Sequence, residues 1–338
     1  MTDRITIGDI AAEAGVSKTT VSRYLNRNYS FMSAKTKEKI AEIIQRENYI
    51  PNNIARSLKS KESHMIGVIT HSLRNQMGAL TIASVNDVCA ANGYGTIVCC
   101  SNNDPSEELK LIQFCQNQQV DGIILIPAVD DKARYETFVK QGTPIELVNR
   151  PVRGWQYGSV YVNHKKLITQ MLKHLHEQGY EKVLLINDGM SYMKQQMVTE
   201  FAKQAKAMFG MKKEESTCQY TQGKEAQKQI EQLLLDFFDR EAGFSKAVFA
   251  INTPTLLFVL KTLDKHSLYS SQDLGVCGYD ALGWSQLVDG GITSIKQPMD
   301  IVGTRGAEEL IRIIQDKTYQ PKKVVLEGTI YYRKSTER

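Results

Sequence analysis

The sequence predicts an N-terminal all-α domain followed by a larger α/β core that has two lobes and parallel sheets. Three observations support this fold class. Near the N-terminus, two segments with helical apolar spacing flank a glycine turn, and from Met65 onward apolar runs alternate with helical stretches. The basic residues are also concentrated in the first sixty positions. A length of 338 residues suits two or three domains of ordinary size.

The first sixty residues contain the pattern of a helix-turn-helix followed by one further helix. Gly15 ends the first helix, and Ser17 stands at the N-cap position of the second. Ser33 is in the same position before the third helix, which carries three isoleucines on one face. The three helices are expected over residues 7–14, 18–26 and 34–48. A helix, a short turn and a second helix together form a helix-turn-helix motif.

A short fourth helix is expected over residues 52–60, because the Ile50-Pro51 pair must end the third helix. The polar run from residue 61 to residue 63 then leads into the core. We therefore place a helix-turn-helix domain at 1–50 and a hinge helix with its linker at 51–63.

The remainder of the chain shows continuous apolar runs of four to seven residues alternating with helical segments. Such runs are typical of parallel strands that are buried on both faces of a sheet. The alternation occurs in two sets, which predicts two doubly wound lobes. We expect one lobe at 64–162 plus 292–321 and the other at 163–291 plus 322–338, with crossings near Val162, Gly291 and Pro321.

Ligands bind doubly wound sheets beyond the carboxyl ends of the strands. We expect the strand ends of the two lobes to face one another across a single cleft. The predicted ends are residues 70–74, 127–131, 149–150, 187–191, 252–253 and 279–284.

Composition and charge exclude several classes of protein. Residues 1–63 hold eleven Lys and Arg against seven Asp and Glu, so +4 of the net charge of +5 lies in this fifth of the chain. A nucleic-acid partner is the natural use of such asymmetry, although a solvated basic face is an alternative. No apolar stretch is long enough to cross a membrane or to form a signal peptide, so we expect a cytoplasmic protein without a membrane partner.

Cysteine spacing and catalytic motifs give no sign of a metal, a cofactor or an enzyme. The six cysteines include no C-x-x-C pair and are expected to be buried, reduced thiols. Glycine-rich phosphate loops, H-E-x-x-H and G-x-S-x-G are missing from the sequence. The sequence therefore predicts neither a metal site nor an enzyme.

The stretch TIGDIAAEAGVSKTTVSRYLN over residues 6–26 closely resembles the LacI/GalR family of bacterial transcription regulators. The match continues to residue 63 through Y-x-P-N-x-x-A-x-x-L and a following I-G-V strand. At fold level it covers the whole chain, and it implies a core like that of periplasmic sugar-binding proteins.

The resemblance implies that the second helix reads double-stranded operator DNA in the major groove. Lys18, Thr19 and Arg23 occupy base-reading positions, and Lys or Arg can donate to guanine. The alternative for Lys18 is a contact to phosphate alone. Phosphate-contacting positions set the register on the duplex, and they match Ser17, Thr20, Ser22, Asn26 and Asn52.

In the family, a leucine from each of two paired hinge helices wedges into the minor groove and kinks the duplex. Leu58 matches this leucine, with Ala55 and Arg56 alongside it. By itself Leu58 would more often be a buried helix residue, but the basic residues around it argue against a wholly buried helix. Paired hinge helices require a homodimer and a near-palindromic operator.

The resemblance also implies an effector site for a sugar or sugar acid in the cleft. By family position its residues are Arg150, Asn252, Asp280, Trp284, Gln297, Asn75 and Met77. Arg150 can grip a carboxylate or two hydroxyls. The alternatives are that Asp280 ties a turn, that Trp284 belongs to the lobe core and that Asn252 holds a strand end.

The chain departs from the family pattern at several positions. The segment 26–33 is one residue longer than in many relatives, and we expect its Tyr29, Phe31 and Met32 to pack between the second and third helices, with DNA backbone contact as the alternative. Gln195 and Met197 stand where many members carry arginines. The pattern around 279–298 looks like that of members that sense sugar acids such as ketodeoxygluconate or gluconate.

The expected function is that of a homodimeric regulator, most often a repressor of carbohydrate or sugar-acid genes, which an effector switches through the angle between the lobes. A protein corepressor stays open as a further partner, because some relatives need one. The rival hypothesis of a solute-binding receptor fits the lobes, but the basic helical head and the lack of a signal peptide argue against it.

Overall fold

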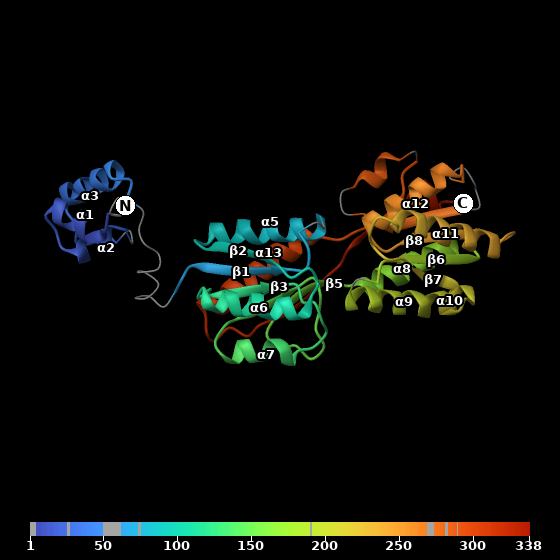
Figure 1. Ribbon diagram of the computed structural model, residues 1–338, viewed down its shortest axis with the longest axis horizontal. Helices are drawn as coiled ribbons and strands as arrows, with labels where there is room; N and C mark the ends of the chain where they lie inside the picture. Colours follow the sequence, from blue (N-terminus) through green and yellow to red (C-terminus); the bar gives the residue numbers. More distant parts are fainter. Residues whose placement is uncertain are drawn as a thin grey trace. The chain divides into compact units, whose positions relative to one another are not determined.

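The computed structural model describes residues 5–25, 28–49, 62–73, 76–189, 191–268, 274–280, 283–288 and 290–338. The chain divides into two compact units, Met1–Ser63 and His64–Arg338. The described part of the first unit contains three helices, and the second unit contains two sheets with their covering helices (Figure 1).

The first unit contains the helices α1 (Ile7–Ala14), α2 (Lys18–Leu25) and α3 (Ala34–Arg46). Thr6 and Asp9 form a capping box at the start of α1, and Gly15 ends it with a φ of 69°, which favours glycine. Ser33 caps α3 by accepting a hydrogen bond from the Thr36 N–H. The three helices share a small core that consists of Ile10, Ala11, Ala14, Val21, Ile40 and Ile43.

The segment between α2 and α3 packs differently from the sequence prediction. Met32 contacts the helical core as expected. Phe31 is instead 86% exposed, and the Arg23 guanidinium lies 5.9 Å from its ring centroid. Tyr29 lies at the surface, edge-on to Tyr24 and beneath Lys37. The prediction that all three residues pack between the helices is therefore wrong for Phe31, because the core is already closed by aliphatic side chains.

The first lobe is built on a six-stranded sheet of order β11-β5-β4-β3-β1-β2, in which every pair is parallel. Its strands are β1 (Met65–Thr70), β2 (Gly95–Cys100), β3 (Gly122–Leu125), β4 (Ile145–Val148), β5 (Ser159–Val162) and β11 (Lys323–Leu326). Helices α5 (Gln76–Ala91) and α13 (Met299–Gln315) cover one face, while α6 (Pro105–Asn117) and α7 (Ala133–Lys140) cover the other (Figure 1).

The second lobe has a six-stranded sheet of order β12-β10-β9-β8-β6-β7, in which only the β10–β12 pair is antiparallel. Its strands are β6 (Lys182–Asn187), β7 (Thr217–Gln219), β8 (Lys246–Ala250), β9 (Leu274–Tyr279), β10 (Thr293–Lys296) and β12 (Thr329–Tyr331). Its helices are α8 (His164–Glu177), α9 (Tyr192–Phe209), α10 (Lys213–Ser216), α11 (Ala226–Arg240) and α12 (Thr253–Lys265), with short 3₁₀ turns at Trp284–Leu287 and Lys334–Thr336.

The chain crosses between the lobes three times, and two of the crossings differ from the predicted boundaries. The first follows β5, as expected from Val162. The second follows β10, so residues 293–296 belong to the second lobe rather than to the first. The third follows β11, so residues 323–326 belong to the first lobe rather than to the second. Because both strands are only four residues long, their apolar pattern carries little information about which sheet they join.

Most of the core matches the buried strands that the apolar runs predicted. Strands β3, β4 and β8 are buried along almost their whole length. Cys89, Cys115 and Cys277 are buried, but Cys99, Cys100 and Cys218 are only partly so, which corrects the expectation that all six thiols are buried. Within the described residues, no helix is long and apolar enough to cross a membrane.

Candidate functional site

The helix α2 begins with a hydrogen-bonded cap that orients its first turn. The Ser17 hydroxyl accepts a hydrogen bond from the Thr20 N–H at 3.1 Å and lies 2.9 Å from the Thr20 hydroxyl. No acidic residue lies in this turn. The positive end of the helix dipole is therefore free to meet phosphate, as the phosphate-contacting role predicted for Ser17 and Thr20 requires.

The opposite faces of α2 differ sharply in exposure. Val21 is fully buried in the helical core and fixes the rotation of the helix. Lys18, Thr19 and Arg23 are all exposed, and Thr19 and Arg23 are neighbours on one face because they are four residues apart. Ser22 is partly buried between these faces. The structure thus leaves all three predicted base-reading side chains exposed, with Thr19 and Arg23 on one face of α2.

Several predicted contacts lie outside the described residues. These are Asn26, Asn52, Ala55, Arg56, Leu58 and Asn75. Their roles in the hinge, on the DNA backbone and in the cleft remain predictions from the sequence.

Arg150 follows β4 and carries a buried charge. The residue is only 6% exposed, and its guanidinium donates to the Asn103 side-chain oxygen at 2.7 Å and to the Pro127 carbonyl at 3.0 Å. Both acceptors are neutral, and burial lowers the pKa of Arg150, while Tyr192, Glu108 and other acidic groups act in the opposite direction. A buried cation without a counter-ion in contact is costly, so this position favours an anionic or strongly polar ligand.

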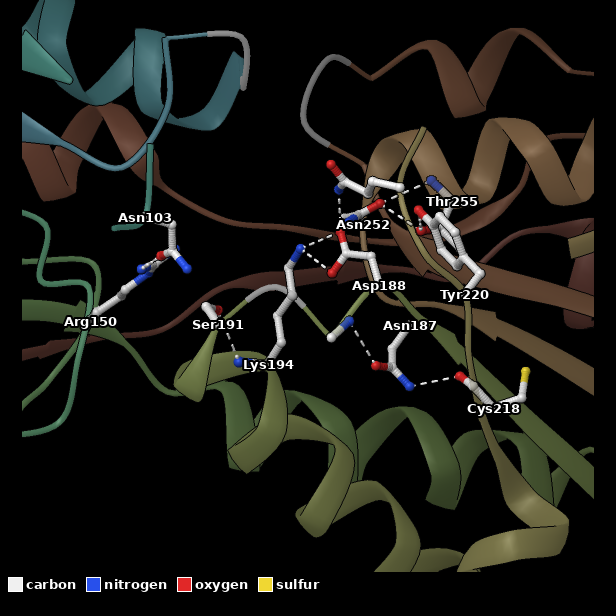
Figure 2. A network of polar contacts seen from close by, with 12 residues as sticks. Asn103, Arg150, Asn187, Asp188, Ser191, Lys194, Cys218, Tyr220, Asn252 and Thr255 are labelled. Carbon is white, nitrogen blue, oxygen red and sulfur yellow. Dashed lines mark hydrogen bonds and ion pairs between the residues drawn. The ribbon is translucent and has the colours of Figure 1, made fainter. Parts of the chain in front are cut away.

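A network of polar side chains faces Arg150 from the second lobe (Figure 2). The Asp188 carboxylate follows β6 and accepts from the Lys194 ammonium at 2.6 Å. It also accepts from the side-chain amides of Gln222 at 2.7 Å and Asn252 at 2.9 Å. Burial lowers the pKa of Lys194, and the contact with Asp188 partly offsets this effect. The network therefore holds a lysine head group in place near the cleft.

The predicted effector residues of the second lobe are held by protein contacts. Asn252 caps α12, because its side-chain oxygen accepts from the N–H and hydroxyl of Thr255. Asp280 is 4% exposed, and its carboxylate accepts from the Ser285 N–H at 3.1 Å. Trp284 begins the 3₁₀ turn and packs against the large core. These placements agree with the structural alternatives for the three residues. A contact with the effector stays a prediction for each of them.

Two other predicted effector residues lie where the chain enters a helix. Gln297 is partly buried between β10 and α13, at a crossing between the lobes. Met77 lies in the first turn of α5 and packs against the core. Gln297 therefore lies in a crossing between the lobes, and Met77 lies at the start of a first-lobe helix.

Sequence reasoning did not assign site roles to His71, Asp188 or Lys194. Each directly follows or lies near a predicted strand end, so the strand-end rule could have found them. His71 follows β1, and its pKa is lowered to about 3 by burial and by the charges of Arg150 and Lys194. These two cations come from different lobes, and both act on one imidazole.

A pocket of about 380 Å³ also lies between the lobes, and none of the predicted effector residues lines it. Its walls are Asp130, Arg153, Lys165, Tyr192, Gln195, Gln196, Thr199 and Glu200. The Tyr192 hydroxyl donates to the Pro151 carbonyl at 3.1 Å and so joins α9 to the first lobe. Gln195, which replaces a common arginine, faces this pocket, whereas Met197 is buried in the core.

Comparison with known proteins agrees with both units. Residues 6–52 match the family model of bacterial regulatory proteins, lacI family, and residues 172–336 match that of the periplasmic binding protein-like domain. The transcriptional regulator KdgR of Bacillus subtilis (strain 168) is 27% identical, over 99% of this chain and 98% of its own length. PtxS of Pseudomonas plecoglossicida is 28% identical, over 98% of this chain and 96% of its own.

A solved structure of the Lac repressor dimer bound to operator and the anti-inducer ONPF has the same fold. It superposes with a TM-score of 0.87 at 22% identity and covers 99% of this chain and 100% of its own. A helix-turn-helix joined to a two-lobed binding-protein core defines a class of ligand-responsive DNA-binding regulators. Over residues 6–52 the chain is similar to bacterial regulatory proteins of the lacI family, and over almost its whole length it is similar to transcriptional regulators such as KdgR.

Proposed function

We propose that this protein is a repressor that binds a near-palindromic operator as a homodimer and responds to an acidic sugar derivative held between its lobes. The DNA-binding part rests on the exposure of Lys18, Thr19 and Arg23 on α2, whose opposite face is fixed in the helical core by the buried Val21. The Lac repressor structure, which has the same fold, is described as a dimer bound to operator. The hinge wedge at Leu58 remains part of the proposal.

The ligand class follows from the charges at the cleft. Arg150 is buried with neutral acceptors, and Lys194 approaches from the other lobe. A carboxylate placed between them would gain two charge-assisted hydrogen bonds and would join the lobes. Hydroxyl groups of a sugar acid could meet the remaining amides and carboxylates of the cleft. A protein corepressor stays open as an additional partner.

Ligand binding would act on DNA affinity through the angle between the lobes. A coupling of about 1–3 kcal/mol is typical of such allosteric linkage. The direction of the response is part of the test, because a ligand that fits the DNA-bound lobe angle strengthens binding and one that fits the other angle weakens it.

The test of DNA binding is a mobility shift with a duplex recovered by genome-wide mapping of the bound protein. Arg23→Ala should weaken binding by about 1–3 kcal/mol, because a side chain that reads a base edge is lost. Lys206→Ala, which removes an exposed charge from α9 in the other unit, is the matched control and should bind as the wild type does. Equal affinity of the wild type and Arg23→Ala would remove Arg23 from the interface. Leu58→Ala should reduce both affinity and DNA bending.

A further inference from the structure

One ring nitrogen of His71 has no hydrogen-bond partner among the described residues. It lies just after β1, where the strand ends, and is partly buried. In the part of the chain that the structure describes, no hydrogen-bond partner reaches its Nδ1 atom, although that atom is buried. A buried polar atom without a partner is rare in folded proteins and costs free energy, so a ligand is the natural source of the missing hydrogen bond.

The charged groups that act on His71 come from both lobes. The charge of Arg150, at the end of β4, and that of Lys194, in the first turn of α9, both act on its imidazole; in Figure 2 these two side chains project from opposite sides of the site. Lys194 already has Asp188 as its counter-ion. Among the described residues, the Arg150 guanidinium donates hydrogen bonds to the neutral oxygens of Asn103 and Pro127, while Glu108 is one of the acidic groups that act on its charge.

This arrangement keeps His71 uncharged in the free protein. Burial removes water from the imidazole, and the two neighbouring cations repel a third positive charge. Both effects lower its pKa to about 3. A carboxylate that enters between Arg150 and Lys194 would reverse the local potential, because it adds a negative charge beside the ring. The imidazole could then accept a proton and donate a hydrogen bond to the ligand.

We propose that His71 is a further ligand-binding residue of the cleft and that it takes up one proton when an anionic effector binds. The inference rests on the proposed acidic effector and specifies how the site responds to it. Among ligands of equal size, the site would thus select an anion over a neutral sugar more strongly in acid than in neutral solution.

The expected pH dependence follows from proton linkage. The ligand-bound protein holds the proton more tightly than the free protein, so ligand affinity rises as the pH falls through the bound-state pKa and levels off only near the free-state pKa of about 3. If the bound-state pKa returns to the ordinary value of about 6.5, affinity at pH 5.5 should be about tenfold higher than at pH 7.5. An aldonate stays ionised over this range, so its own titration does not mask the effect.

The experiment is isothermal titration calorimetry of the full-length protein with potassium gluconate, potassium 2-oxogluconate and potassium glucuronate, with glucose as the neutral probe. Each titration is run at pH 5.5, 6.5 and 7.5 in two buffers with different ionisation enthalpies, which gives the number of protons taken up. His71→Asn keeps a hydrogen-bonding side chain but cannot titrate. His176→Asn, at an exposed position on α8, is the matched control.

The inference predicts that an acid binds about tenfold more tightly at pH 5.5 than at pH 7.5, with net proton uptake approaching one at the lower pH. His71→Asn should lose both the pH dependence and the proton uptake, whereas His176→Asn should keep them. Acid binding with neither pH dependence nor proton uptake in the wild type would overturn the role of His71 and leave the proposed function intact. Lack of binding by all three acids would overturn the acidic effector class and the inference together. Proton counting in the wild type does not depend on how well the variant folds.

Discussion

Substitution of Ile40 by alanine should unfold the DNA-binding unit without unfolding the core. Ile40 is fully buried in α3, and it is one of six buried apolar residues at the centre of the helical core among the described residues. Three buried carbon groups are lost, worth about 0.8 kcal/mol each in transfer free energy. Cavity formation raises the cost of such substitutions to about 2–5 kcal/mol.

That cost is comparable to the whole stability of a domain of this size, because a single core in so short a chain supplies about 3–5 kcal/mol. The second unit has its own much larger core, and its described core residues all lie outside the three helices. Ile40→Ala should therefore abolish DNA binding at 37 °C while the lobes stay folded and bind ligand.

Differential scanning calorimetry and fluorescence anisotropy with a labelled operator duplex measure the two effects. The transition of the small unit should shift to low temperature, and the transition of the core should not move. Glu42→Ala, on the exposed face of the same helix, is the control and should leave both transitions in place. Retained DNA binding in Ile40→Ala, or an equal shift of both transitions, would refute the account of two separate cores.

Three further predictions concern single features of the two units. Burial and the nearby Glu309 raise the pKa of Glu146 well above its ordinary value, so the stability that its protonated form provides is complete below about pH 4.5 and is lost as the pH rises towards the folded-state pKa. Glu146→Gln should raise the melting temperature at pH 8 and flatten its dependence on pH, and parallel pH profiles in the two proteins would contradict this. Lys194→Met should lower the free energy of unfolding of the core by about 3–5 kcal/mol, because it leaves the buried Asp188 carboxylate without its cation. In urea unfolding, the double variant with Asp188→Asn should recover part of this loss. Additive effects of the two substitutions would contradict the ion pair. Phe31→Ser should change the unfolding free energy of the helical unit by less than about 0.5 kcal/mol, since the ring is 86% exposed, and a large loss would show that it packs in solution.

The three described helices of the first unit could be predicted almost to the residue, because local sequence signals mark where they begin and end; the helix expected over 52–60 lies outside the described residues. Gly15 and Ser33 mark a helix end and a helix start by their own backbone and side-chain chemistry. The long apolar strands were equally clear, since strands such as β1 and β6 are buried on both faces. Phe31 was misplaced because an apolar residue near a helix gives no sign that the core beside it is already full.

The strand assignments near the lobe crossings could not be read from the sequence. Strands β10 and β11 are four residues each; β11 pairs with β5, which lies far away in the chain, whereas β10 pairs with β9, the strand before it. The grouping of side chains in the cleft could not be predicted from the sequence either, because the effect of Arg150 and Lys194 on His71 depends on how the two lobes meet. The predicted strand ends identified the loops that carry these residues. Which of their side chains lie close enough to influence one another depends on the fold.

The measurement that tests the central claim most directly is selection of duplexes from a random pool by the full-length protein, followed by sequencing. A dimer with two reading helices predicts an enriched motif made of two inverted half-sites, and Arg23→Ala should lose the base preference at one symmetric pair of positions. Recovery of no motif, or the same motif with Arg23→Ala, would contradict the claim that α2 reads an operator.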